Sequence, residues 1–321
     1  MDRNLALETV RVTEWAALAS TRWMGRGDEK AADQAAVDAM RTALNGLDIR
    51  GTVVIGEGER DEAPMLYIGE QVGTGKGPEL DIALDPLEGT TITAQGGYNA
   101  MTVIAMTTKG GFLAAPDVYM DKIAVGGGLP DDLVMIDASP AENLRNLAKA
   151  KKVSVEELVV CILNRTRHEE IIAKVREVGS RIMLIQDGDV SAVIATAQPN
   201  SGVDLYMGSG GAPEGVLAAA ALSCIGGQMQ GRLLFRNDDE KKRATKQGIT
   251  DFNRVYSHHD LAHGDDIMFA ATGVTDGPLL RGVRRTDNGM MTHSIVMRSL
   301  TGTSRFIEAH HNFTRKPFPK A

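Results

Sequence analysis

The sequence predicts an α/β protein, and two observations support this fold class. Its second half alternates short apolar runs, typical of strands, with segments of helical periodicity, and this alternation is typical of βαβ units with a largely parallel sheet. The composition combines 43% hydrophobic residues with only 4% aromatic residues and 35 glycines, which indicates an aliphatic core and many tight turns. With 321 residues the chain can form one intertwined unit or two subdomains, and we expect a soft boundary near residue 140.

The individual elements follow from local patterns along the chain. Apolar residues at helical spacing predict a helix over residues 4–19, and Asp28 can cap a second helix that runs to about Leu44. Ser139 and the following proline begin a lysine-rich helix. The other helices are expected at residues 169–178, 189–197 and 215–225, and the strands at residues 51–55, 79–84, 100–106, 158–163, 181–185, 203–207 and 267–271, with further strands through Arg298 and Ile307.

Charge and composition exclude several classes of function. A formal net charge of -7 and a pI near 5.6 argue against general binding to nucleic acids or anionic membranes. No apolar run approaches the length of a membrane span, and the first residues do not resemble a signal peptide, so we expect a cytoplasmic protein. The two cysteines, Cys161 and Cys224, lie inside apolar runs, where we expect small buried thiols rather than a disulfide.

The most informative stretch covers residues 79–91. Polar and apolar residues alternate up to Leu84, as in a strand, and Pro86 is expected to end that strand because it cannot donate a backbone hydrogen bond. Gly89 permits a tight turn, and the hydroxyls of Thr90 and Thr91 can cap a following helix.

This stretch offers a metal site and an anion site close together. Asp81, Asp85 and Glu88 are expected to cluster, and carboxylates bind hard cations such as Mg²⁺. Backbone N–H groups at the start of a helix bind phosphate. The simpler alternative is a strand-to-turn corner with polar caps, which this stretch alone does not exclude.

Other carboxylates strengthen the metal interpretation. Glu57 and Glu59 follow the strand at residues 51–55 and would point to the same side, although a solvated acidic loop explains them equally well. Asp33 lies in the first turns of the second helix, where a surface carboxylate is also favoured by the helix dipole. Because two neighbouring strands end in carboxylates, we expect one metal pocket.

Polar groups also follow the strands of the second half. Arg165 and Arg167 are expected on one face of an extended segment, where they could hold one phosphate or simply face solvent. Asp187 and Asp189 could accept hydrogen bonds from sugar hydroxyls, although for Asp189 a helix cap is slightly favoured. Glu214 stands at a helix start and can reach a cation.

Several familiar motifs are absent. The glycine-rich segment 208–214 lacks the third glycine of a dinucleotide fingerprint, and the segment 73–77 has the wrong spacing for a P-loop. His258, His259 and His263 have no intervening glutamate and no nearby cysteine, which argues against zinc.

Taken together, these segments resemble the class II fructose-1,6-bisphosphatase family, and the resemblance runs nearly end to end. It rests on Gly-Arg-Gly-Asp at 25–28, Gly-Glu-Gly-Glu at 56–59, Asp-Pro-Leu-Glu-Gly-Thr at 85–90 and Gly-Gly-Ala-Pro-Glu-Gly at 210–215. The third motif also resembles the wider lithium-sensitive sugar-phosphatase superfamily. The chain departs from the family's usual pattern at Asn164 and Thr166, and at Glu29, which precedes Lys30.

The resemblance implies a layered α/β/α/β/α sandwich, Mn²⁺ or Mg²⁺ as cofactor, and a homo-oligomer, either a dimer or a tetramer. It implies a metal- and 1-phosphate-binding subdomain at residues 1–140, and a sugar- and distal-phosphate-binding subdomain at residues 141–321. The metal ligands would be Asp33, Glu57, Asp85, Glu88 and Glu214. The substrate contacts would be Glu88, Gly89, Thr90, Tyr119, Arg165, Thr166, Arg167, Asp187, Gly188, Asp189 and Gly211.

The expected reaction is metal-dependent hydrolysis of the 1-phosphate of fructose 1,6-bisphosphate, in the service of gluconeogenesis. Thr90, Glu57 and Asp33 are the expected catalytic residues, with Thr90 either orienting the attacking water or attacking directly. Three alternatives remain: a dual fructose-1,6- and sedoheptulose-1,7-bisphosphatase of carbon fixation, an inositol phosphatase, and a non-catalytic sugar-phosphate sensor.

Overall fold

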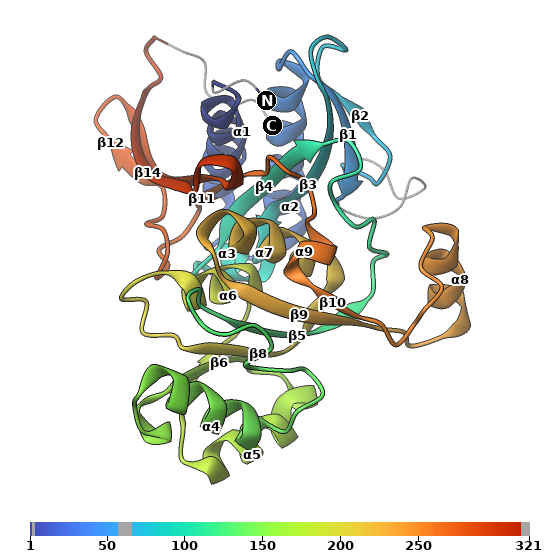
Figure 1. Ribbon diagram of the computed structural model, residues 1–321. Coiled ribbons are helices and arrows are strands. Elements are labelled where there is room, and N and C mark those ends of the chain that lie inside the picture. The colour runs from blue at the N-terminus through green and yellow to red at the C-terminus, as the bar shows by residue number, and fades with distance from the viewer. Residues whose placement is uncertain (2–3, 57–65, 316–321) are drawn as a thin grey trace. The chain divides into compact units, whose positions relative to one another are not determined.

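The computed structural model describes residues 1, 4–56 and 66–315, and the chain divides into two compact units (Figure 1). The first unit comprises Met1–Phe112 and Gly264–Ala321, and the second comprises Leu113–His263. The second unit is therefore an insertion within the first, and the boundary that we expected near residue 140 falls inside it. Among the described helices, none combines the length and the apolar character that crossing a bilayer requires.

The first unit is built on an eight-stranded sheet in the order β12-β13-β11-β4-β3-β1-β2, with β14 on the other side of β13. β1 and β3 are parallel and all other neighbours are antiparallel. The strands are β1 (Arg50–Ile55), β2 (Gln71–Val72), β3 (Glu79–Glu88), β4 (Met101–Thr108), β11 (Met268–Gly273), β12 (Arg284–Thr286), β13 (Gly289–Arg298) and β14 (Thr303–Asn312).

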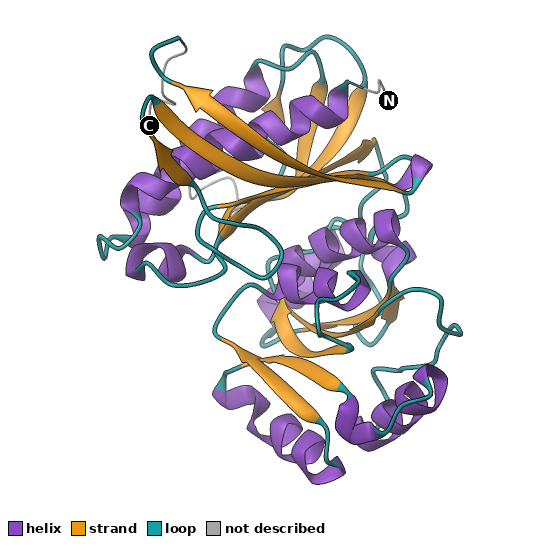
Figure 2. Ribbon diagram, turned by 90° about the vertical axis from the view of Figure 1, so that its left-hand side faces the viewer, coloured by secondary structure: helices purple, strands orange, loops and turns teal. Residues whose placement is uncertain are grey.

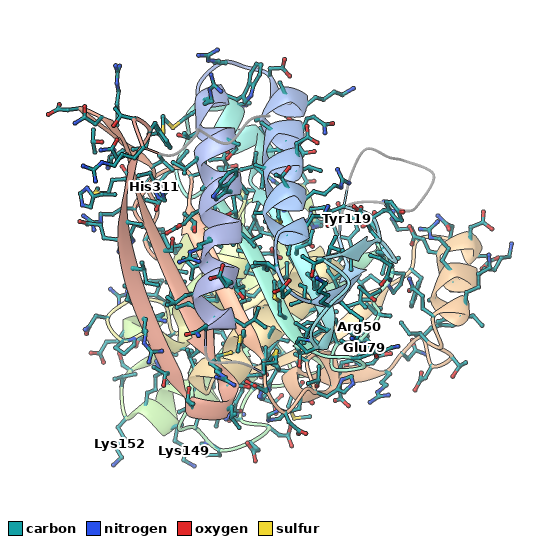
Figure 3. All side chains as sticks on the ribbon, turned by 90° about the horizontal axis from the view of Figure 1, so that it is seen from above. Arg50, Glu79, Tyr119, Lys149, Lys152 and His311 are labelled. Atoms are coloured by element: carbon teal, nitrogen blue, oxygen red, sulfur yellow. The ribbon has the colours of Figure 1, made fainter. Side chains whose placement is uncertain are left out.

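Two long helices pack side by side against this sheet, α1 (Leu5–Ser20) and α2 (Glu29–Asn45), and the short helix α3 (Thr90–Gln95) packs against α2. The core between them is aliphatic, with Leu18, Met40 and Ile82 fully buried. At the start of the parallel pair, Arg50 and Glu79 lie beside each other, with nitrogen and oxygen 3.7 Å apart (Figure 3). Asp28 caps α2 as expected, because its side chain accepts a hydrogen bond from the backbone N–H of Ala31.

The second unit contains a six-stranded sheet in the order β10-β9-β5-β8-β6-β7. Only β7, β6 and β8 are parallel, so the expectation of a largely parallel sheet was wrong. β5 and β9 fill the antiparallel half through long-range pairings that local alternation of strand and helix does not reveal. The strands are β5 (Tyr119–Val125), β6 (Val159–Leu163), β7 (Arg181–Ile185), β8 (Leu205–Gly211), β9 (Gln228–Leu234) and β10 (Val255–Ser257).

Helices cover both faces of the small sheet (Figures 1 and 2). On one face lie α4 (Pro140–Lys151) and α5 (Glu169–Val178), and on the other lie α6 (Asp189–Ala197) and α7 (Ala212–Ile225). Because side chains alternate along a strand, Ile123 of β5 enters the core under α4 and α5, whereas Lys122 points toward α6. Two shorter helices complete the unit, α8 (Asp238–Lys246) and α9 (His258–Leu261).

The α/β fold class is confirmed, since each unit joins a mixed sheet to packed helices. The helices expected at residues 169–178 and 189–197 and the strand at 181–185 have the expected bounds. Cys161 and Cys224 are buried thiols and form no disulfide with each other, as expected, and burial raises the pKa of the Cys161 thiol to about 12.

The Asp28 cap can be tested by mutation. We expect Asp28→Ala to lower the free energy of unfolding by about 1 kcal/mol, because the Ala31 N–H loses its acceptor, whereas Asp28→Asn should retain most of the stability. Urea unfolding followed by circular dichroism measures both. Equal losses in the two variants would show that the cap is not what stabilises the start of α2.

Candidate active site

We expected β3 to end at Asp85. In the structure of the first unit it instead continues through Pro86 to Glu88. Pro86 is tolerated because β1 pairs with β3 only as far as Ala83, and because the pairing with β4 shifts register between Asp85 and Glu88. The same irregularity lets the Asp85 side chain accept a hydrogen bond from the Leu87 N–H at 3.0 Å. The Glu88 side chain is buried.

The turn after β3 depends on Gly89. Its φ of 90° lies in the left-handed region that glycine adopts readily, and it is the N-cap of α3. Thr90 and Thr91 are therefore the first residues of the helix and not its caps, which corrects the expected capping. The half-buried Thr90 side chain stands at the helix start, where backbone N–H groups lack intrahelical acceptors.

Asp81 does not belong to this group, although we expected it to cluster with Asp85 and Glu88. It is four residues before Asp85 on the same strand, a separation of roughly 13 Å in a β-strand. Its carboxylate accepts a hydrogen bond from the Gly110 N–H at 2.7 Å. Asp81 is thus a structural acceptor near the start of β3.

Asp33 lies near the start of α2, a few residues after the Asp28 cap, and α2 packs against α3. Its Oδ1 atom is buried and accepts no hydrogen bond from the residues that the structure describes. Burial raises the pKa of this carboxyl group. Glu57, the other acidic residue expected here, lies outside the described residues, as does Glu59.

In the second unit, the central feature is a buried lysine that the sequence analysis missed. The side chain of Lys122, only 1% exposed, forms an ion pair with Asp189 and donates a hydrogen bond to the Gly211 carbonyl at 3.0 Å. The buried Tyr206 hydroxyl also donates to Asp189, at 3.4 Å. Asp189 is therefore not a side-chain cap of α6; the N-cap is Gly188, in the left-handed conformation.

The glycines at the end of β8 make room for two carboxylates. A Cβ atom on Gly210 would lie 2.2 Å from Asp189 Oδ2, and one on Gly211 would lie 1.8 Å from Glu214 Oε2. Both distances are shorter than real Cβ contacts, so a side chain at either position would displace the carboxylate beside it. The glycine-rich motif therefore allows the carboxylates of Asp189 and Glu214 to pack closely against the end of β8.

Glu214 is held in the first turn of α7 with its Oε2 atom buried and without a hydrogen-bond partner in the described part of the chain. Burial, reinforced by the negative charge of Asp189, raises the pKa of Glu214 to about 7, and Lys122 partly opposes this. A buried carboxylate with an unused oxygen is costly unless a positive group satisfies it.

A cluster of cations surrounds Tyr119 at the start of β5. The Arg167 guanidinium lies 4.9 Å from the ring centroid and that of Arg236 lies 5.5 Å from it. Arg167 is fixed by donation to the Ser209 carbonyl at 2.8 Å. Arg165 is exposed, and Arg167 belongs to a 3₁₀ turn, Thr166–His168, so the two arginines do not lie on one extended segment as we expected. No sequence motif marks Arg236, since its role depends on the long-range contact with Tyr119.

His168 fixes this turn against β8. Its Nδ1 lies 2.7 Å from the Leu163 carbonyl, and its Nε2 accepts from the Ser209 N–H at 2.8 Å. Burial lowers the pKa of His168, so the ring is neutral and can accept at Nε2. Nearby, Asp187 accepts from the Gly188 N–H at 3.1 Å, and burial raises the pKa of Asp187.

The chemistry of these groups fits a hard divalent cation. Carboxylate oxygens are the ligands that Mg²⁺ and Mn²⁺ prefer, and Asp33 and Glu214 each keep one buried oxygen without a hydrogen bond from the described residues. Over residues 1, 4–56 and 66–315, no three acidic, histidine or cysteine side chains lie close enough together to hold a metal. The set expected from the sequence also includes Glu57, which is outside those ranges.

Comparison with known proteins places the chain in a family. The mixed α/β arrangement agrees with a sugar-phosphatase fold, and the family match identifies the class of protein as a phosphoric monoester hydrolase. Residues 3–311 match the family described as "Bacterial fructose-1,6-bisphosphatase, glpX-encoded", and the chain belongs to this family.

The relatives align over almost their whole length. The chain is 47% identical to fructose-1,6-bisphosphatase 1 class 2 of Escherichia coli (strain K12), over 98% of this chain and 97% of that protein. It is 44% identical to D-fructose 1,6-bisphosphatase class 2/sedoheptulose 1,7-bisphosphatase of Trichodesmium erythraeum (strain IMS101), with the same coverage. The class II family that the sequence motifs resembled is thereby confirmed.

The buried Lys122–Asp189 pair provides a stability test. We expect Lys122→Met to lower the free energy of unfolding by about 3–5 kcal/mol, because it leaves the Asp189 carboxylate buried without its counter-ion. The double variant Lys122→Met/Asp189→Asn should recover part of this loss. Denaturant unfolding of both variants measures the effect. A double variant no more stable than Lys122→Met alone would contradict the assignment of the loss to the unpaired charge.

Proposed function

We propose that this protein hydrolyses the 1-phosphate of fructose 1,6-bisphosphate to give fructose 6-phosphate and inorganic phosphate, in the cytoplasm and in the service of gluconeogenesis. The match of residues 3–311 to the bacterial fructose-1,6-bisphosphatase family carries this proposal. The half-buried Thr90 at the start of α3 and the fixed Arg167 support it, because a bisphosphate needs one group at the reacting phosphate and another at the distal one.

The proposed metal ligands of the first unit are Asp33, Glu57, Asp85 and Glu88, and that of the second unit is Glu214. Bound Mn²⁺ or Mg²⁺ would neutralise phosphoryl oxygens and make an attacking water more acidic. The acidic residues also keep the site anionic before the cation arrives, which disfavours binding of the substrate alone. Asp33 and Glu57 are proposed to contribute to catalysis as well as to metal binding.

The chain's own groups would hold the reacting phosphate. Backbone N–H groups after Gly89 point out of the start of α3, where the helix leaves them without partners, and can donate to phosphoryl oxygens. The Thr90 hydroxyl orients the water that attacks phosphorus. The bond between phosphorus and the C1 oxygen then breaks, and that oxygen takes up the proton that the attacking water gives up.

The second unit would bind the rest of the substrate. Arg165 and Arg167 hold the 6-phosphate, and Tyr119 supports the Arg167 guanidinium through its ring face. Asp187 and the backbone at Gly188 and Gly211 contact the sugar. Because the Lys122 ion pair already uses Asp189, we propose that Asp189 fixes the shape of the sugar pocket.

A metal-removal experiment tests the reaction class. We expect chelator-treated protein to release no phosphate from fructose 1,6-bisphosphate, and Mn²⁺ or Mg²⁺ to restore release, because the carboxylates need the cation to accept a dianionic phosphate. Phosphate is measured colorimetrically, with sedoheptulose 1,7-bisphosphate in parallel, since one relative carries that activity in its name. Tight substrate binding by folded protein without release under either metal would instead favour a sensor.

The role of Arg167 is tested by a comparison of substrates. We expect Arg167→Met to raise the KM for fructose 1,6-bisphosphate about 10- to 100-fold, as loss of a charged hydrogen bond predicts, with a smaller change in kcat. The KM for fructose 1-phosphate, which has no 6-phosphate, should change little. Arg176→Met, on the exposed side of α5, is the control for loss of one positive charge. Equal effects on both substrates would refute the assignment.

A further inference from the structure

Arg236 is anchored at three points although its side chain is exposed. That side chain is 63% exposed, whereas the side chain of Glu240, four residues later on α8, is only 2% exposed. The Glu240 carboxylate accepts hydrogen bonds from the Arg236 backbone N–H at 2.6 Å and from its Nε at 2.7 Å, and it pairs with Nη2 at 2.6 Å. An exposed arginine normally keeps many rotamers, and ordering it costs entropy. The buried carboxylate therefore fixes the direction of this guanidinium group.

The strand register explains why Arg236 lies beside Tyr119. Tyr119, the first residue of β5, pairs with Gly211 of β8 on one side and with Leu234 of β9 on the other. Arg236 follows Leu234 by two residues, where the chain leaves β9 toward α8 (Figure 1). Arg167 is bound to β8 through its own hydrogen bonds. The two arginines therefore reach the Tyr119 ring from the β8 side and from the β9 side of β5.

Both guanidinium groups keep one donor nitrogen available. Arg167 donates to the Ser209 carbonyl through Nε and Nη2, and Arg236 binds Glu240 through the same two nitrogens. In the described part of the chain, neither Nη1 has a hydrogen-bond partner, and no carboxylate forms an ion pair with Arg167. Glu240 thus offsets only one of the two positive charges. A bound anion would accept from both arginines and offset their mutual repulsion.

We propose that Arg236 is a specificity-determining residue, which donates together with Arg167 to the distal phosphate of the sugar bisphosphate, and that Glu240 is its positioning residue. This inference rests on the proposed function, because it takes the phosphate held beside Tyr119 to be the distal one. A phosphate dianion has several acceptor oxygens, so it can accept from both guanidinium groups at once. A monophosphate without that group leaves these donors unpaired. Arg236 therefore favours bisphosphates over monophosphates.

The contact with the Tyr119 ring does not by itself require the Glu240 anchor. A cation–π contact needs only a cation over the ring face, and an ordinary surface ion pair needs no buried carboxylate. Lys242 and Asp239, also on α8, form such an ordinary pair at 2.8 Å, with side chains 72% and 79% exposed. The buried partner distinguishes Arg236 from this pair. Lys242 is accordingly the matched control for the loss of one positive charge on α8.

Binding of fructose 6-phosphate tests Arg236 without turnover, because this compound carries the phosphate in question and no 1-phosphate. We expect Arg236→Met to weaken its binding about 10-fold in the presence of Mg²⁺, measured by isothermal titration calorimetry. This is the lower end of the range for a charged hydrogen bond, since the side chain is exposed. Arg236→Lys, which keeps the charge without the planar fork, should lie in between.

The control Lys242→Met should bind fructose 6-phosphate like the parent protein. Unchanged binding by Arg236→Met, or equal weakening by Arg236→Met and Lys242→Met, would overturn the proposal. A parent protein that does not bind fructose 6-phosphate would contradict a distal phosphate site beside Tyr119.

Steady-state kinetics separates this inference from the proposed function. We expect Arg236→Met to raise the KM for fructose 1,6-bisphosphate with little change in kcat, and to leave both constants for fructose 1-phosphate unchanged. An active parent whose Arg236→Met variant shows equal KM changes for both substrates would refute the role of Arg236 alone. A parent protein that releases no phosphate from either substrate would refute the proposed function, and the calorimetry would still decide on Arg236.

A double-mutant cycle tests the positioning role of Glu240. We expect Glu240→Gln to raise the KM for fructose 1,6-bisphosphate about 3-fold, because the amide accepts at only one of its two heads. Added to Arg236→Met, the same change should raise the KM no further. Glu240 also lies at the start of α8, where its N–H donates to Asn237. Additive effects of the two changes would show that Glu240 acts through the fold of α8 and would overturn its positioning role.

Discussion

The second unit depends on one buried ion pair. Lys122 enters from β5, Asp189 from the start of α6, and the Gly211 carbonyl from the end of β8, so a single ammonium group holds three segments together. All three carry residues of the candidate site, since β5 begins at Tyr119 and α7 follows Gly211 directly. Glycine at positions 210 and 211 leaves room for this arrangement, because the carboxylates of Asp189 and Glu214 occupy the space that a Cβ atom would need. The positions of these charged groups and the glycine backbone at the end of β8 therefore depend on each other.

Sequence reasoning succeeded where the signal was local. The Asp28 cap, the helix bounds around residues 169–178 and the burial of Cys161 follow from neighbouring residues and short periodicities. It failed where distant pairing decides the outcome. Nothing near Pro86 indicates that β3 continues beyond it. Pro86 is tolerated in the strand because β1, more than thirty positions earlier in the sequence, ends before it could pair with this residue.

The candidate site shows the same division. Motifs marked Asp85, Glu88, Glu214 and the arginines, but they did not distinguish Asp81, which accepts a hydrogen bond from the Gly110 N–H in the loop after β4. Lys122 and Arg236 carry no motif and acquire a role only through contacts across the second sheet and around Tyr119. A sequence pattern can therefore identify candidate ligands of a site. The groups that hold those ligands in place are recognised only from the three-dimensional structure.

The insertion of the second unit has a consequence for biosynthesis. The backbone of Leu113 bonds to Leu261, and that of Gly264 bonds to Gly111, so the chain leaves and re-enters the first unit at adjacent points. All strands of the second sheet are translated before β11, β12, β13 and β14, which make up half of the eight strands of the first sheet. On the ribosome the inserted unit is therefore complete while the N-terminal half of its host still lacks its partners. The first unit, whose synthesis begins first, is therefore the last of the two units to be completed.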